Sequence, residues 1–115
     1  MNDFQSTFEY IPEDPNTVSI NFYYLIDNVP AVKIKLEEDL SKVSIFYEAN
    51  ATYRNQGYAS EALGLTIDYV FNNLAIFEIH AFTMNQQSKH IAMKNGFLFP
   101  RGDQLGILTN PNYQR

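Results

Sequence analysis

The sequence has 115 residues and a formal net charge of −5, and 45% of its residues are apolar. A chain of this length forms one domain and buries about two thirds of the surface that it exposes when unfolded, which excludes disorder as the expected state. The absence of cysteine excludes disulfides, a thiol nucleophile and a Cys-ligated zinc site. The acidic balance argues against a nucleic-acid-binding surface, and we expect no metal site.

The beginning of the chain lacks the basic and apolar stretches of a signal peptide, and no apolar run reaches the ~20 residues that a membrane span requires. We therefore expect a cytoplasmic protein that does not bind membranes. Charge is distributed unevenly: residues 1–48 hold nine acids and three bases, whereas residues 49–115 hold four acids and five bases. An anionic ligand fits the second part better, and a cationic ligand fits the first.

Three alternating stretches in the first half of the chain predict antiparallel strands. Apolar residues alternate with other residues over 18–26 and again over 32–36, and residues 27–30 supply the turn between them. After an acidic loop at 37–39, a third alternation over 43–49 separates an apolar face from a second face. The apolar set is Val43, Ile45, Tyr47 and Ala49, and the opposite set is Ser44, Phe46 and Glu48.

The hydrophobic period then becomes that of an amphipathic helix over 59–74, with Gly57 just before it. The β-forming residues 76–82 predict a strand parallel to the third, because a strand, a helix and a strand make a crossover unit. A second helix fits 86–95, with Asn85 as its N-cap and Gly96 at its C-terminal end. The remaining candidate strands are 97–99 and 105–109. The expected fold class is α+β: a single domain over 1–115 with a mixed, mostly antiparallel sheet and two main helices.

Residues 51–63 carry the most informative pattern, because a predicted strand enters this stretch and a predicted helix leaves it. Arg54 and Gly57 lie at the junction. The first amides of a helix lack intrahelical partners and lie at its positive end, so they bind a pyrophosphate where a glycine allows close approach. One arginine and one glycine also fit an ordinary helix start, and the pattern by itself leaves both interpretations open.

Two motifs together resemble the GNAT superfamily of N-acetyltransferases. The motifs are Arg54-x-x-Gly57-x-Ala59, which is similar to the acetyl-CoA motif, and Asn85-x-x-Ser88 followed by Lys94-x-Gly96-Phe97. Their spacing is most similar to the branch that acetylates ribosomal-protein N-termini. The resemblance implies a GNAT-like acyl-CoA N-acyltransferase fold and acetyl-CoA as co-substrate. It also implies an enzyme that transfers an acetyl group directly to a primary amine, either a protein N-terminus or a small amine.

The resemblance also implies a place for each part of acetyl-CoA. The residues that would hold the pyrophosphate are Arg54, Asn55, Gln56, Gly57, Tyr58 and Ala59. The pantetheine arm would pair with the end of the third strand at Glu48, Ala49 and Asn50, and a backbone N–H of Ala49 or Glu48 would face the thioester carbonyl. Asn85 and Ser88 would lie across the gap, close to the sulfur.

Acetyl transfer to an amine requires a base for the amine proton and an acid for the leaving thiolate. Glu48 is the first candidate for the base and His80 is its rival, and each also fits an ordinary surface side chain. Many members of the superfamily have a tyrosine acid where this chain has Ala92. Ser88 would assist the leaving thiolate instead, or would simply cap its helix. Tyr47 fits a packing role.

The beginning of the chain leads to further expectations. Full-sized relatives carry a first strand and two helices before the hairpin, whereas few residues precede Val18 here. A bare sheet edge would favour a homodimer, and the acid-rich residues 1–48 would draw a cationic acceptor. The short beginning and Ala92 also favour an alternative, a non-catalytic acyl-CoA-binding or protein-interaction module. A third possibility is an α+β protein without a CoA site.

Overall fold

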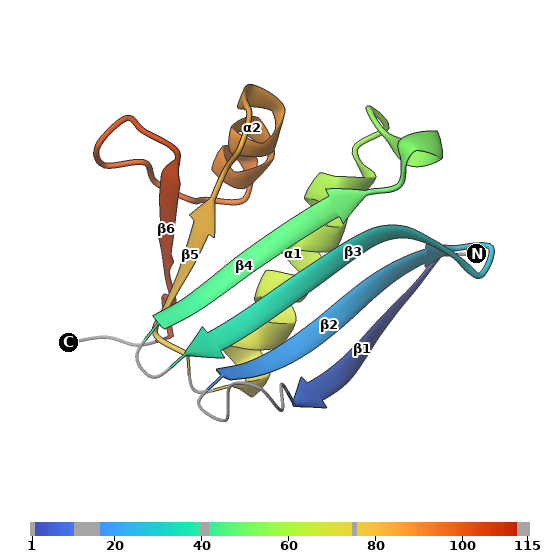
Figure 1. Cartoon of the computed structure of the whole chain (residues 1–115), viewed down its shortest axis with the longest axis horizontal. Coiled ribbons are helices and arrows are strands. Elements are labelled where there is room, and N and C mark those ends of the chain that lie inside the picture. The colour runs from blue at the N-terminus through green and yellow to red at the C-terminus, as the bar shows by residue number, and fades with distance from the viewer. Residues whose placement is uncertain (1, 11–16, 40–41, 75, 113–115) are drawn as a thin grey trace.

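The computed structural model describes residues 2–10, 17–39, 42–74 and 76–112, and its six strands form one sheet in the order β1-β2-β3-β4-β5-β6 (Figure 1). The strands are β1 Asn2–Tyr10, β2 Thr17–Ile26, β3 Val29–Asp39, β4 Lys42–Ala49, β5 Glu78–Phe82 and β6 Leu105–Thr109. The helices are α1 Tyr58–Asn73 and α2 Gln86–Lys94, with a short 3-10 helix, η1, over Ala51–Tyr53. Only β4 and β5 pair in parallel among the strand pairs described. The predicted mixed, mostly antiparallel sheet with two helices is therefore confirmed.

The turn between β2 and β3 is tighter than predicted. Asp27 and Asn28 alone form it, with φ angles of 50° and 67°, a left-handed conformation that these short polar residues tolerate well. Val29 and Pro30 already pair with Ile26 and Leu25. A two-residue turn sets the register of the hairpin, and this register decides which side chains lie beside one another on the sheet.

The acidic residues 37–39 belong to β3 and do not form the expected loop. Leu36 is buried while Glu37 lies on the opposite face, where its carboxylate is 2.8 Å from the Lys35 ammonium. The prediction of a loop was wrong because charged residues are compatible with a strand that has one face in solvent.

Strand β1 was not expected from the sequence. It pairs with β2 along its whole length, from Asn2 opposite Ile26 to Tyr10 opposite Val18, and the Phe4 ring stacks on Phe22 with 5.7 Å between centroids. The edge strand of the described sheet is therefore β1 and not β2, and the homodimer stays a prediction.

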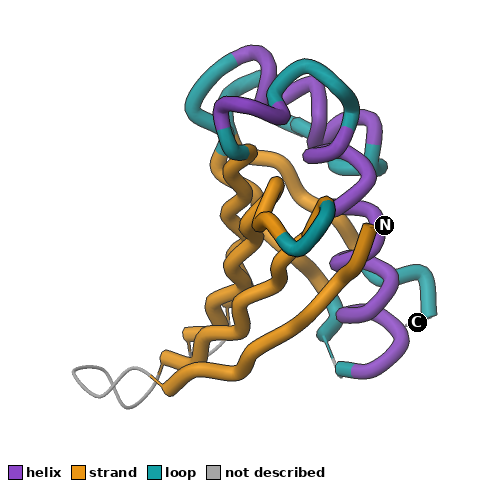
Figure 2. Tube along the Cα trace, turned by 90° about the vertical axis from the view of Figure 1, so that its right-hand side faces the viewer, coloured by secondary structure: helices purple, strands orange, loops and turns teal. Residues whose placement is uncertain are grey.

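The helices lie on one side of the sheet, as Figure 2 shows. The apolar stripe of α1 packs on the face of the sheet that carries Phe22, Ile34 and Ile45. The buried residues of α1 are Ala62, Leu63, Thr66, Ile67, Val70 and Phe71. In the described ranges no helix covers the opposite side, which we call the open face. Its central residues are Asn21, Tyr23, Lys33, Lys35, Phe46 and Glu48.

The predicted helices agree with the structure to within one residue at each end, and the predicted strand at 105–109 is confirmed. Residues 97–99 contribute a single bridge, Leu98 to Ile107, in place of a strand. Within the described residues, no helix is both long and apolar enough to cross a membrane.

Candidate functional site

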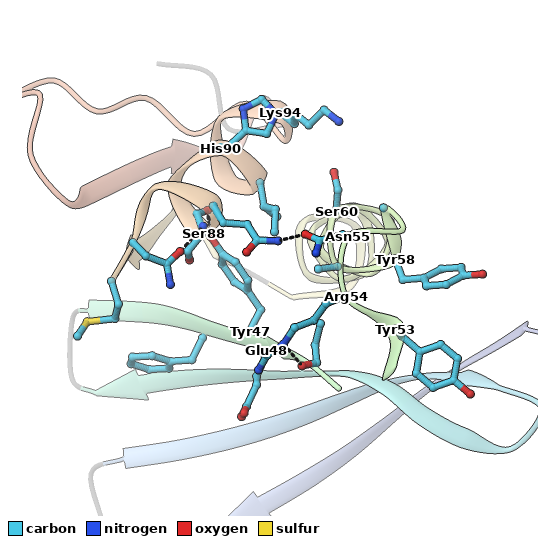
Figure 3. A pocket seen from close by; sticks show the side chains of 18 of the residues that line it. Tyr47, Glu48, Tyr53, Arg54, Asn55, Tyr58, Ser60, Ser88, His90 and Lys94 are labelled. Atoms are coloured by element: carbon cyan, nitrogen blue, oxygen red, sulfur yellow. Dashed lines mark hydrogen bonds between the residues drawn. The ribbon is translucent and has the colours of Figure 1, made fainter. Parts of the chain in front are cut away.

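Strands β4 and β5 separate soon after they meet. Among the described residues they pair only at Ser44 with His80 and at Ile45 with Ala81, and residues 46–49 of β4 continue beyond the last pair. The gap opens into a cleft of about 650 Å³ between β4, the start of α1 and helix α2 (Figure 3). The predicted site residues that line it are Glu48, Ala49, Arg54, Asn55, Gly57, Tyr58, Ala59, Asn85 and Ser88.

Two predicted site residues do not line the cleft. The Asn50 side chain accepts a hydrogen bond from the Thr52 N–H at 3.1 Å and caps η1. The Gln56 amide donates to the Thr52 carbonyl at 3.2 Å. Both side chains are thus engaged with the loop that carries them, a local arrangement that the sequence motif did not indicate.

The start of α1 offers the backbone geometry expected of an anion site. Gly57 is the N-cap, with a φ of 83° and no side-chain cap, and the first intrahelical bond runs from the Glu61 N–H to the Gly57 carbonyl at 3.1 Å. The N–H groups of Tyr58, Ala59 and Ser60 precede that bond and have no partner in the helix. A Cβ built on Gly57 would meet nothing within 4 Å, so the space in front of these amides is open.

Arg54 lies between the end of β4 and this helix start. Its Nε donates to the Ala49 carbonyl at 3.4 Å, and its side chain is exposed (Figure 3). The rings of Tyr53 and Tyr58 are turned away from Ser88, with 6.1 Å between their centroids. The backbone N–H of Tyr58 therefore lies at the helix start, while its ring packs against Tyr24 and Tyr53.

The free edge of β4 faces the gap through Ala49. The Asn50 N–H donates to the Ala31 carbonyl of β3 at 2.7 Å, and successive residues of a strand direct their backbone groups to opposite sides. The N–H of Ala49 therefore points away from β3, toward the gap, as does its carbonyl, which accepts from Arg54. Of the two N–H groups considered, that of Ala49 and not that of Glu48 faces the gap.

Helix α2 forms the opposite wall, and Asn85 caps it. The Asn85 side chain accepts from the Ser88 N–H at 2.8 Å, so the capping role that we considered for Ser88 belongs to Asn85. The Ser88 hydroxyl lies on the side of α2 that lines the cleft, beside the Tyr47 phenol.

Tyr47 connects the two walls, which the sequence analysis did not foresee. Its hydroxyl donates to the Ser88 carbonyl at 2.7 Å, and Figure 3 shows the ring rising from β4 toward α2. Burial raises the pKa of the Tyr47 phenol above its ordinary value of 10.0, and an interaction with the Ser88 side chain, distinct from the bond to its carbonyl, opposes part of this rise. The phenol is protonated at neutral pH and fixes the start of α2 relative to β4.

The two candidate bases have different surroundings. Glu48 is exposed on the open face and also lines the cleft, whereas His80 does not line it. The His80 Nε2 lies 2.6 Å from a carboxylate oxygen of Glu78, on the same strand. The structure thus brings Glu48 and not His80 to the site. His90, which the sequence analysis did not select, lines the cleft from the exposed side of α2.

A further side-chain contact crosses the cleft. The Gln87 amide of α2 donates to the Asn55 side-chain oxygen at 2.8 Å (Figure 3). Asn55 has a φ of 62°, so the loop before α1 directs its side chain toward α2 through a left-handed turn. No local sequence signal joins two residues so far apart in the chain.

Comparison with known proteins gives the same fold. Residues 7–98 match the family model described as an acetyltransferase (GNAT) domain. The ribosomal-protein-S5-alanine acetyltransferase from Vibrio fischeri superposes with a TM-score of 0.69 at 14% identity, over 87% of this chain and 65% of that chain. A GNAT-family acetyltransferase from Bacillus anthracis has a TM-score of 0.64 at 21% identity, over 80% of this chain and 66% of that chain.

A ligand-bound structure is also similar. Mycobacterium smegmatis RimJ in complex with CoA-disulfide has a TM-score of 0.66 at 17% identity, over 88% of this chain and 56% of that chain. No curated protein sequence matches this chain. The chain spans between 56% and 66% of the length of these solved structures. The resemblance to ribosomal-protein acetyltransferases is confirmed at the level of the fold.

GNAT acetyltransferases use acetyl-CoA, and solved structures of this fold carry CoA or AcCoA. The family model covers most of the sequence, including both motifs up to Phe97, and the splayed strands, the helix start and the second helix lie where those motifs predict them. The chain belongs to the GNAT acetyltransferase family.

Proposed function

We propose that this chain binds acetyl-CoA in the cleft between β4 and β5 and transfers the acetyl group to a primary amine. The observation that carries the proposal is the combination of a free β4 edge at residues 46–49 with an open helix start at Gly57, on two sides of one cleft. The first can pair with an amide-bearing pantetheine arm, and the second can accept phosphate.

The residues present fit the pyrophosphate at the start of α1. Open space beside Gly57 allows phosphate oxygens to reach the amides of residues 58–60, and the exposed Arg54 guanidinium supplies charge beside them. Asn55 lines the same wall. Lys94 lines the cleft from α2, whereas Lys89 is directed to the Phe99 ring, 4.9 Å from its centroid.

The reaction needs few side chains. A neutral amine attacks the thioester carbonyl carbon, the C–N bond forms, the C–S bond breaks, and the products are an N-acetyl amide and the free thiol of CoA. The nitrogen gives one proton to Glu48, directly or through water, and the sulfur takes up one proton. The Ala49 N–H stabilises the developing oxyanion. The Ser88 hydroxyl donates a hydrogen bond to the departing sulfur and is the substitute for the tyrosine that Ala92 replaces.

The alternative function, a non-catalytic acyl-CoA-binding module, is favoured by one observation. Ala92 is fully buried in the core and carries no acidic group. On this alternative the chain would bind acetyl-CoA without releasing CoA in the presence of any amine.

One experiment separates these functions. The melting temperature is measured against acetyl-CoA concentration, and release of CoA thiol is followed with a panel of amines and N-terminal peptides. A ligand that binds only the folded state raises the melting temperature as its concentration rises. We expect both a thermal shift and thiol release. A shift without release supports the non-catalytic module, and no shift at millimolar acetyl-CoA refutes both functions.

A further inference from the structure

A second hollow, of about 290 Å³, lies on the open face of the sheet. Its side-chain lining comes from three strands and consists of Asn21, Tyr23, Lys33, Lys35, Phe46 and Glu48. The hollow and the cleft share Phe46, Tyr47 and Glu48 of β4. If acetyl-CoA occupies the cleft, an amine reaches Glu48 from this hollow.

The strand register places the polar groups of the hollow in two rows. Tyr23, Lys33 and Glu48 are direct cross-strand neighbours, and Asn21, Lys35 and Phe46 form the adjacent row. Directly opposite residues have Cβ atoms about 5 Å apart. An ammonium group at Glu48 therefore has the Lys33 ammonium as its nearest charged neighbour within the described sheet.

The two lysines differ in their partners. Lys35 is 2.8 Å from the Glu37 carboxylate, which compensates its charge. Lys33 is exposed and has no ion pair with any described residue. The hollow thus has one carboxylate and one uncompensated ammonium side by side, flanked by the rings of Tyr23 and Phe46.

The acidic residues 37–39 do not lie at the end of β4. Glu37 lies opposite Ser44, and the row that contains Phe46 separates this pair from Glu48. The acidic residues after Glu37 lie farther still along β3. At the end of β4, Lys33 is the cross-strand neighbour of Glu48.

We propose that the open-face hollow binds a free α-amino acid with an apolar or aromatic side chain as the acceptor. In such a molecule one carbon separates the ammonium from the carboxylate, which matches the adjacent Glu48 and Lys33, and the side chain lies along Tyr23 and Phe46. The small volume of the hollow favours a small molecule over a folded protein surface. The inference rests on the proposed function for its chemistry, while the binding itself can be measured without turnover.

The test uses two acceptors that differ in one group, L-phenylalanine and L-phenylalaninamide, which lacks the carboxylate. Equilibrium binding is measured by calorimetry in the presence of CoA, and thiol release is measured with acetyl-CoA. We expect Lys33→Gln to weaken binding and kcat/KM for L-phenylalanine about tenfold, the size typical of a charge-assisted hydrogen bond at a partly exposed site. The same variant should change binding and kcat/KM for L-phenylalaninamide by no more than about twofold.

Arg101→Gln is the matched control, because it removes one positive charge from an exposed turn outside both hollows. We expect Arg101→Gln to change neither the binding nor the kcat/KM of either acceptor. Lys33→Arg should restore most of the binding and kcat/KM that Lys33→Gln loses with L-phenylalanine. Equal effects of Lys33→Gln on both acceptors, or none on either, overturn the inference. So does a preference for peptides with an acidic first residue over the free amino acid. Lys33-dependent binding without thiol release retains the inference and rejects catalysis.

Discussion

At the scale of single residues, the candidate site depends on which side chains are already engaged. Asn85 caps α2, so the Ser88 hydroxyl is not needed for the helix. Glu48 has exposed surface and no ion pair within the described chain, unlike His80, which contacts Glu78. These differences explain why Glu48 and Ser88 are the better candidates for proton transfer.

Glu48→Gln and Ser88→Ala should affect turnover and not folding, because both side chains line the cleft without supporting the core. We expect each variant to lower kcat by about tenfold or more, the lower range for general acid and base catalysis, with an unchanged thermal shift by acetyl-CoA. Steady-state rates with a responsive amine check this. Full activity of both variants would assign the proton transfers to solvent.

Tyr47→Phe tests the link between β4 and α2. Loss of the hydrogen bond to the Ser88 carbonyl should cost about 1 kcal/mol of unfolding free energy. The raised pKa of Tyr47 also predicts a pH effect. The unfolded phenol ionises near pH 10 while the folded one keeps its proton, so this contribution is complete below pH 10 and is lost as pH rises through the folded pKa.

Denaturant unfolding of both proteins between pH 8 and 11 measures the effect, and the difference between them isolates Tyr47 from the other tyrosines. The stability gap between wild type and Tyr47→Phe should shrink above pH 10. A constant gap would mean that the phenol is not protected from ionisation in the folded protein.

At the scale of secondary-structure elements, Gly57 at the start of α1 has a left-handed backbone conformation and open space beside it. Gly57 and Gly102 both have positive φ angles, 83° and 67°, and a Cβ at either position would meet nothing within 4 Å. Gly57 lines the cleft and Gly102 lies in the turn after α2, outside it. Substituting each glycine therefore separates the stability that is lost to backbone strain from the ligand binding that is lost when the site is blocked.

Gly57→Val and Gly102→Val should each lose about 1–2 kcal/mol of stability, because a β-branched residue tolerates the left-handed region poorly. Only Gly57→Val should abolish the thermal shift by acetyl-CoA, because its side chain occupies the space in front of the helix amides. Melting curves with and without ligand measure both effects. A normal shift in Gly57→Val would place the phosphates elsewhere.

At the scale of the whole molecule, the sequence predicts the helices and strands that have a local side-chain pattern. It does not predict structure that depends on pairing between strands. The alternation at 43–49 and the helical period of α1 correctly placed Ile45, Glu48 and Leu63. The same reasoning missed β1, whose pairing with β2 is a long-range property, and read residues 37–39 as a loop because of their charge.

In the candidate site, too, local motifs were informative and contacts between distant residues were not predicted. Motif spacing identified the cleft walls, because both motifs lie at helix starts. Three contacts join residues distant in the chain and have no local signal: Tyr47 with Ser88, Gln87 with Asn55, and the cross-strand pair of Lys33 and Glu48.

The short junction between β4 and β5 has a consequence for cooperativity. Two residue pairs join a block of four strands to a block formed by β5 and β6, so each block can open without much loss of pairing in the other. A ligand that pairs with β4 and contacts α2 couples the blocks. We therefore expect acetyl-CoA to slow amide hydrogen exchange in β6, whose residues do not line the cleft, as well as at 46–49. Mass-spectrometric exchange with Gly57→Val as the unliganded control measures this, and protection confined to the cleft walls would show that the two blocks remain independent when the ligand is bound.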